Sequence, residues 1–248
     1  MCLGLLAISV QAQHTLSIDA LLNEDTQTLS ITQKITFVND SNTALSEIYL
    51  LDWANSFSSK TTPLAERFAE NFNSSFHFEK DENRGRTTIE FIKNKQNETL
   101  SWHREKGDDI IKISLKEALA PSAQIEINLA YTIKVPNDKY TRYGVSKNGD
   151  YKLRYWFIAP AVFNGEWKAY SNKNVDDFFM SPSKFIINFH FPKEYKLFSD
   201  LDVIAETIVN GKKLIHLEKK FGFSKDKIFQ NYTIKIRNLK LFKFHLFE

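Results

Sequence analysis

The chain has 248 residues, a formal net charge of +3 and 42% hydrophobic residues. These values are typical of a globular protein and exclude wholesale disorder and collagen-like repeats. A charge this close to balance gives no support to nucleic-acid binding. The 21 phenylalanines predict a large aromatic core. The low glycine count of 8 argues against nucleotide sites built from glycine-rich loops.

Residues 1–12 have the features of a partial signal peptide. The stretch is apolar and ends in Val10-Gln11-Ala12, the small-x-small pattern of a signal-peptidase site. Cleavage there would remove Cys2, the only cysteine. The stretch is too short to cross a bilayer, which takes about 20 residues. We therefore expect an exported protein with no membrane span; a buried first strand is the alternative interpretation.

Alternation of apolar and polar residues predicts about a dozen β-strands. Two long strands between Thr15 and Phe37 form a predicted hairpin with one solvated face. Asn210-Gly211, between two apolar runs, is a strong hairpin signal. Further strands are predicted at 48–51, 87–92, 99–103, 110–115, 124–135, 151–161, 163–170 and 184–191. With no repeat and no linker, we expect one all-β domain over 13–224, a large antiparallel saddle-shaped sheet or sandwich.

One short helix is predicted over Thr62–Phe72. Thr62 can cap its N-terminus, and Pro63 suits the first helical position. Leu64, Phe68 and Phe72 recur at intervals of four, so we expect them to pack as one face on the sheet.

The tail over residues 225–248 has a different character. Apolar and basic residues mix there without clean alternation, and the end is aromatic. Three interpretations stay open: a final edge strand, an out-of-frame extension past a frameshift, or a stretch that lies on a membrane surface.

Catalytic motifs are absent from the sequence. No two of the six histidines are spaced as in His-Glu-x-x-His, and there is no Gly-x-Ser-x-Gly motif. Paired carboxylates, as a glycosidase uses, occur at Asp108-Asp109 and Asp176-Asp177. Adjacent acids on a strand point to opposite faces, so each pair offers one inward carboxylate at most.

Aromatic residues on a strand face could instead bind sugar by stacking. The alternative is that they pack in the core of a phenylalanine-rich protein. The candidate platform consists of Trp156, Phe157, Phe163, Trp167 and Tyr170.

Three stretches together resemble a known family. They are residues 50–68 (LLDWANSFSSKTTPLAERF), 151–162 (YKLRYWFIAPAV) and 167–177 (WKAYSNKNVDD). The sequence is similar to the N-terminal region of exported M1-family zinc metallopeptidases, aminopeptidase-N-like enzymes of Bacteroidetes-type bacteria. The resemblance extends from about Thr15 to Lys220.

The resemblance implies a β domain that caps a thermolysin-like zinc domain and contacts the free amino end of a peptide substrate. The zinc ligands would lie in that second domain, so we expect no catalytic residue, metal ligand or cofactor in this chain. Family members offer a Gln- or Glu-bearing stretch to the substrate amine. Glu166 is its nearest counterpart here, and Trp156 and Trp167 are further candidate contacts.

The leading hypothesis is therefore a fragment, the non-catalytic cap domain of an exported M1-type zinc aminopeptidase. Its partners would be the zinc domain and, in the parent enzyme, a peptide substrate. The alternative is a free-standing exported β-sandwich that binds glycan or protein through the aromatic platform. A third hypothesis is a carbohydrate-active enzyme that uses a carboxylate pair.

Overall fold

The computed structural model describes residues 14–105, 107–141, 143–173, 178–181, 183–219 and 233–239. The predicted signal peptide over residues 1–12 lies outside the described residues. So do Asp176-Asp177 and all of the tail except 233–239.

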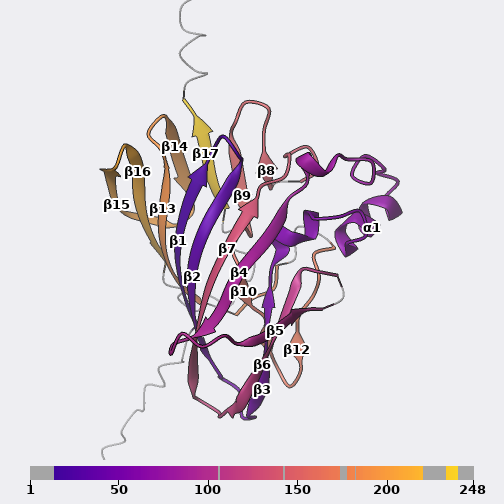
Figure 1. Cartoon of the computed structure of the whole chain (residues 1–248), viewed down its shortest axis with the longest axis vertical. Helices are drawn as coiled ribbons and strands as arrows, with labels where there is room; N and C mark the ends of the chain where they lie inside the picture. The colour runs from indigo at the N-terminus through magenta and orange to yellow at the C-terminus, as the bar shows by residue number, and fades with distance from the viewer. Residues whose placement is uncertain are drawn as a thin grey trace, which may run out of the picture.

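A seven-stranded sheet, the main sheet, dominates the molecule (Figure 1). Its order is β15-β16-β13-β1-β2-β7-β4. Along β1, Leu16, Ile18 and Ala20 are buried while the residues between them face outward, which confirms the predicted alternation. The bounds are β1 His14–Asn23, β2 Thr28–Val38, β4 Arg86–Asn94, β7 Gln124–Lys134, β13 Ser183–Pro192, β15 Asp202–Val209 and β16 Lys212–Lys219.

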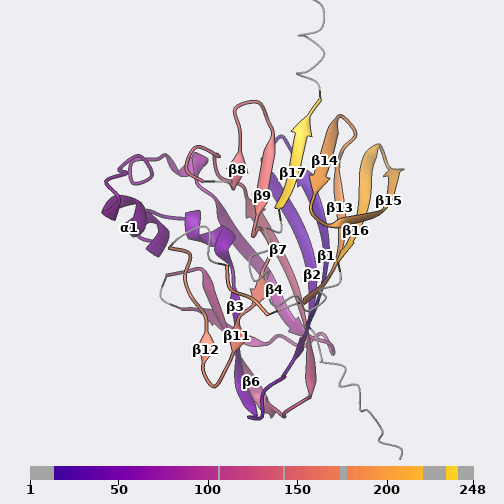
Figure 2. The same cartoon turned by 180° about the vertical axis from the view of Figure 1, so that it is seen from behind.

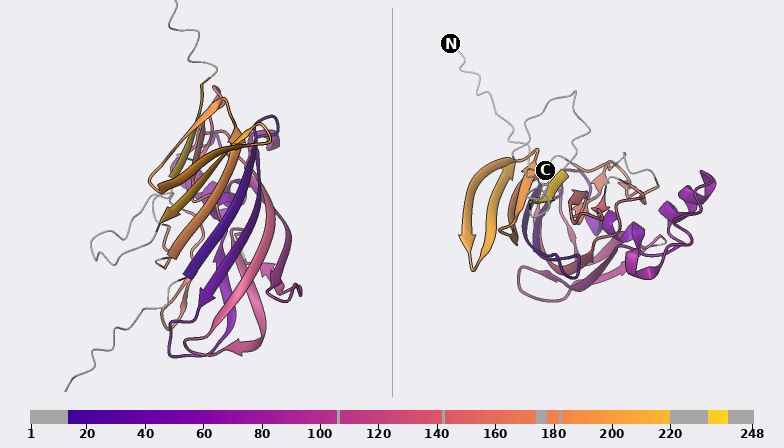
Figure 3. Two further views of the ribbon diagram at one scale, coloured as in Figure 1. Left: turned by 90° about the vertical axis from the view of Figure 1, so that its left-hand side faces the viewer. Right: turned by 90° about the horizontal axis from the view of Figure 1, so that it is seen from above.

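Smaller sheets cover one face of the main sheet, and the core lies between the layers (Figure 2). One has the order β10-β3-β6-β5, another β14-β17-β9-β8, and β11 and β12 form a hairpin. The strands of the main sheet fan out with a pronounced twist (Figure 3). The bounds are β3 Leu45–Leu51, β5 Ser101–Arg104, β6 Ile110–Leu119, β8 Gly144–Val145, β9 Tyr151–Arg154, β10 Ala159–Pro160, β11 Val162–Phe163, β12 Trp167–Lys168, β14 Tyr195–Ser199 and β17 Thr233–Asn238.

The all-β fold class is confirmed, with two details that local patterns did not indicate. β1 pairs with β13 in parallel, a pairing between segments far apart in the chain that no hairpin constrains. The predicted strand over 151–161 is divided, because Tyr155 adopts a positive φ of 52° and turns the chain between β9 and β10. In the tail, β17 lies between β14 and β9, inside its sheet.

The predicted helix is present as α1, Pro63–Glu70, and the Thr62 side chain accepts a hydrogen bond from the Ala65 N–H, as a cap should. The expected aromatic face is shorter than predicted. Phe68 packs against the core, but Phe72 lies beyond the helix and is 98% exposed. Two 3₁₀ helices, Trp53–Phe57 (η1) and Asp81–Asn83 (η2), complete the described elements. Among the described residues, no helix is long and apolar enough to cross a membrane.

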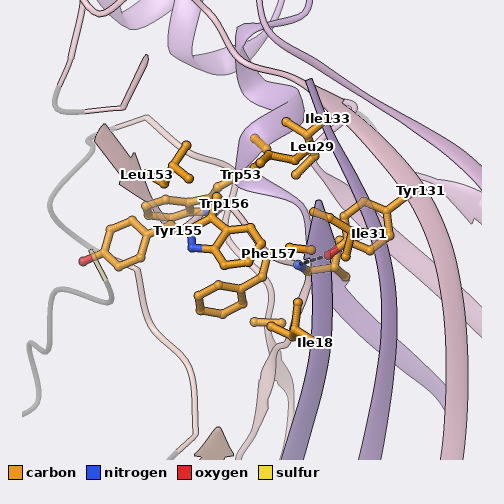
Figure 4. Close-up of a cluster of buried hydrophobic side chains, with 14 of the residues drawn as sticks. Ile18, Leu29, Ile31, Trp53, Tyr131, Ile133, Leu153, Tyr155, Trp156 and Phe157 are labelled. Atoms are coloured by element: carbon orange, nitrogen blue, oxygen red, sulfur yellow. Dashed lines mark hydrogen bonds between the residues drawn. The ribbon is translucent and has the colours of Figure 1, made fainter. Parts of the chain in front are cut away.

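Aromatic side chains fill the space between the layers (Figure 4). A buried hydrogen-bond network ties the layers together there. Gln33 Nε2 donates to the carbonyl of Ile158 at 2.6 Å, and the Tyr131 hydroxyl donates to Gln33 Oε1. The Ile158 N–H donates back to the Tyr131 hydroxyl at 3.3 Å, so the irregular chain after β9 is fixed to β2 and β7.

Candidate functional site

The three family-like stretches meet at η1. Trp53 Nε1 donates to the carbonyl of Tyr170 at 3.2 Å, and the Asn172 side-chain amide donates to Ser56 Oγ at 2.8 Å. The Trp53 ring also packs edge-on against Tyr155 at 5.6 Å between centroids. Residues separated by more than a hundred positions therefore form one junction, and two of them, Trp53 and Tyr155, belong to the cluster drawn in Figure 4.

A buried polar cluster, here the Asp52–Asp109 cluster, supports this junction. In it, Asp52 is 1% exposed. One of its carboxylate oxygens accepts the Thr87 hydroxyl at 2.8 Å, and the other pairs with Arg104 Nη2 at 2.8 Å. Charge-assisted bonds of this kind offset the cost of burying the carboxylate. The cluster consists of Asp52, Asn55, Thr87, Arg104, Asp109 and Asn172.

The turn between β5 and β6 brings the cluster together. Asn55 Nδ2 donates to the Asp108 carbonyl at 2.7 Å, and Asn55 Oδ1 accepts the Thr87 N–H at 2.9 Å. Gly107 is required in this turn, because its φ is +110° and a Cβ there would lie 2.8 Å from Ser171 Oγ.

Asp109 is the second buried carboxylate, with 0% exposure. Its Oδ2 accepts the Asn172 N–H at 2.7 Å. Burial raises the pKa of Asp109 to about 6, and the Asp52 charge raises it further. The hydrogen bonds from Asn172 and Ser171 lower the pKa but do not outweigh burial. Two buried carboxylates thus belong to one cluster, in which the Arg104 guanidinium pairs with that of Asp52. The cluster can take up a proton, but its acids are closed to a substrate.

Of the acid pair Asp108-Asp109, Asp109 is buried and Asp108 is exposed, so at most one carboxylate points inward, as predicted. The pair lies in the turn before β6, however, and not on a strand. Beside the cluster lies a cavity of about 10 Å³, room for about one water molecule. It is lined by Trp53, Phe57, Thr141, Tyr143, Arg154, Tyr155 and Asn172. This geometry therefore supports a role of the cluster in anchoring the chain.

The predicted substrate contacts divide into two places. Glu166 and Trp167 belong to the β11–β12 hairpin, seen from behind in Figure 2. Glu166 is exposed, and its hydrogen bond and ion pair with Lys168 lower the pKa of Glu166. Trp167 is half-buried against Tyr49, at 5.5 Å between centroids. Trp156 is 1% exposed and packs inside the core, away from any surface ligand. Whether Glu166 or Trp167 contacts a substrate stays a prediction.

The five candidate platform residues do not share one surface. Phe157, like Trp156, is 1% exposed. Phe163 packs edge-on against Trp167 at 5.2 Å, and Tyr170 is 57% exposed. The described structure therefore offers no continuous aromatic platform from these residues.

Sequence reasoning missed the Asp52–Asp109 cluster. A signal for it exists in residues 51–57 (LDWANSF), where Asp52 and Asn55 follow a buried strand among apolar neighbours. Polar residues in that setting are buried only with hydrogen-bond partners.

Within the described segments, no three His, Cys, Asp or Glu side chains come together in a group that could hold a metal ion. The zinc that the resemblance implies has no fitting donor set in this part of the chain. His216, for example, has protein partners at both ring nitrogens: Nδ1 lies 2.7 Å from Asn188 Oδ1 and Nε2 lies 3.1 Å from Glu218 Oε1.

No family model and no curated protein matches the sequence of this chain. Solved structures do match its fold. An M1 zinc metallopeptidase from Deinococcus radiodurans aligns over 90% of this chain and 40% of its own, with a TM-score of 0.52 and 11% identity. A variant of it bound to a Tyr-Ser-Ala substrate gives 0.51, 11% identity and the same coverage. A two-domain M1 zinc metallopeptidase bound to L-tryptophan gives 0.52 and 11%, covering 91% and 43%.

The chain spans about two fifths of the length of these peptidases. At this identity the likeness concerns the fold alone. The Bacteroidetes-type origin stays a prediction. The chain therefore shares the fold of one part of the two-domain M1 zinc metallopeptidases.

Proposed function

We propose that this chain is the non-catalytic β domain of an aminopeptidase-like protein of the M1 type. In this proposal a zinc domain elsewhere in the parent protein hydrolyses peptides from their amino ends. The observation that carries the proposal is the fold match over 90% of this chain to peptidases more than twice its length.

The site geometry supports a structural role for the junction. Asp52 and Asp109 are buried, and each is used to hold backbone or side chains of neighbouring segments. A hydrolytic pair must instead reach a substrate across a cleft. In the proposal, the Asp52–Asp109 cluster fixes the family-like stretches so that the β domain presents a rigid surface to the zinc domain.

The finer parts of the proposal rest on the sequence. Residues 1–12 support export. The lack of a His-Glu-x-x-His motif in this sequence supports the non-catalytic role. Glu166 and Trp167 are proposed to face the substrate amine from the β11–β12 hairpin.

Sequencing of the gene locus tests the proposal directly. All three frames beyond the codon for Ser224 are translated and searched for His-Glu-x-x-His followed by a downstream glutamate. We expect one frame to encode that helix. Closed frames for several hundred codons, with no such gene beside this one, would reject the proposal.

A second measurement addresses the non-catalytic role. The purified chain is incubated with aminoacyl-nitroanilide substrates, with and without added zinc. We expect no turnover above the buffer rate. Zinc-dependent turnover that is lost in Asp109→Ala but kept in Asp108→Ala would contradict this role.

A further inference from the structure

Two phenylalanines stand out on the surface beside α1. Phe72 is 98% exposed and Phe78 is 78% exposed. Exposure this complete is uncommon for phenylalanine, which is among the residues most often buried. Both follow α1 on an arm that projects from the side of the sheets (Figure 1). The pair is named the aromatic tip.

The backbone at Phe72 is held in an unfavourable conformation. Its φ is +59°, a left-handed value that glycine or asparagine usually supplies at the end of a helix. The Asn73 N–H donates to the Phe68 carbonyl at 2.8 Å, which closes the turn. A bulky residue at this position is therefore both strained and solvent-exposed, so packing within this chain does not explain it.

A rigid frame holds the loop that carries the tip. Phe76 is fully buried, and the Arg84 guanidinium stacks over its ring at 4.7 Å. Arg84 Nη2 also donates to the carbonyls of Phe76 at 2.8 Å, His77 at 3.2 Å and Glu79 at 3.2 Å. The loop between the two exposed rings is thus fixed by one buried cation.

Glu79 adds a second fixed point. Its carboxylate pairs with Lys139, accepts the Tyr140 hydroxyl and accepts Asn83 Nδ2 at 2.9 Å. Burial opposes ionisation, but these partners outweigh it and lower the pKa of Glu79 to about 2. These contacts hold the backbone of residues 76–79 next to Phe78, and an ordered backbone lowers the entropic cost of binding.

The charge of the arm indicates the class of partner. Between Lys60 and Arg84 there are four Lys or Arg residues and five Asp or Glu residues. Such a balance gives no attraction to an anionic membrane. Rigid aromatic side chains that enter apolar pockets are instead the usual anchors of protein interfaces.

We infer that Phe72 and Phe78 form a docking surface that inserts into an apolar surface of a partner protein, and that this partner is the zinc domain of the parent peptidase. The identity of the partner rests on the proposed function. The docking surface itself rests on the exposure, backbone strain and rigid frame of the arm.

Photo-crosslinking in the source cells tests the inference. Benzoylphenylalanine replaces Phe72 in one variant of the full chain and Ile204 in the control variant. Ile204 is 59% exposed on β15, at the opposite side of the molecule (Figure 1). We expect a cross-link from position 72 to a polypeptide that carries His-Glu-x-x-His, and none from position 204. Cross-links only to lipid, only to a second copy of this chain, or to nothing would overturn the inference.

The affinity of this chain for the purified cross-linked protein gives a quantitative test. Phe72→Ser with Phe78→Ser should weaken binding at least tenfold, whereas Ile204→Ser with Ile208→Ser should change it less than twofold. Circular dichroism checks that both double variants fold. Equal weakening in the two would overturn the docking surface.

The two proposals fail separately. A tenfold loss measured with a partner that lacks the zinc motif supports the docking surface and rejects the proposed function. A locus that encodes the zinc domain, with binding to it unaffected by the double variant, rejects the docking surface alone.

Discussion

Asp109 makes the stability of the protein depend on pH in an unusual direction. Burial raises its folded-state pKa to about 6, above the unfolded value near 3.9. Between these values the folded state binds more protons than the unfolded state, so stability falls as pH rises. The loss is complete above pH 6 and amounts to about 3 kcal/mol, since one pKa unit corresponds to about 1.4 kcal/mol. Urea denaturation of wild type and Asp109→Asn at pH 4 and pH 8 measures it. The stability of the variant relative to wild type should rise by about 2–3 kcal/mol from pH 4 to pH 8, because a small part of the loss already occurs below pH 4.

The exposed neighbour Asp108 supplies the matched control. Asp108→Asn should keep the same offset from wild type at both pH values. His14 has the opposite dependence. Burial lowers its folded-state pKa to about 4, so between pH 6.5 and about 4 the unfolded state binds more protons and stability falls as pH falls. A difference between Asp109→Asn and wild type that does not change with pH would contradict the assignment to Asp109.

The backbone conformation at Phe72 is expected to reduce the stability of the folded protein. Its left-handed backbone costs roughly 1 kcal/mol for a residue other than glycine or asparagine. Phe72→Asn should therefore raise the free energy of unfolding by about 0.5–1 kcal/mol in denaturant titration. Phe78→Asn removes an exposed ring without a left-handed backbone and should leave stability within about 0.5 kcal/mol of wild type. Equal effects of the two substitutions would show that strain is not the cause.

At the scale of elements, the features that the sequence predicted well are those encoded by neighbouring residues. Thr62 and Pro63 begin α1, and the alternation in 125–133 gives β7. The end of α1 was less predictable, because the spacing of Phe68 and Phe72 continues the helical pattern past the turn at Asn71. The Asp52–Asp109 cluster depends on two contacts between residues that are distant in the sequence. Arg104 and Asp52 lie 52 positions apart, and Asn172 and Asp109 lie 63 positions apart, so no local pattern could indicate the cluster.

The hairpin of β15 and β16 depends on its turn. Asn210 and Gly211 have φ values of 49° and 76°, the pair of positive angles that a type I′ turn requires. Gly211→Val should strain this turn by about 1 kcal/mol or more. Because β15 is exposed along its whole length, the effect should be local. Hydrogen exchange over 203–209 should accelerate severalfold while the midpoint of global unfolding stays unchanged. Exchange that also accelerates in β1 would show that the hairpin is coupled to the whole sheet.

At the scale of the molecule, the sequence favoured an all-β sandwich but not the arrangement of its layers. The parallel contact of β1 with β13 and the insertion of β17 between β14 and β9 both join distant segments. Their choice depends on how apolar faces fit together in three dimensions, whereas alternation only indicates which residues of a strand face inward. The burial of Trp156 could not be predicted for the same reason, because it depends on the bend in the chain at Tyr155.

The contact between the two layers depends on Tyr131. Its buried hydroxyl donates to Gln33 Oε1 and accepts the Ile158 N–H, so it connects β2, β7 and the chain after β9. Tyr131→Phe would leave a buried carbonyl oxygen and a buried N–H without their partner, at about 1–3 kcal/mol for each. We expect a loss of about 3 kcal/mol in the free energy of unfolding, with faster hydrogen exchange at 156–161. The exposed Tyr170→Phe should change stability by less than about 0.5 kcal/mol. A Tyr131→Phe variant as stable as wild type would mean that apolar packing alone holds the layers together.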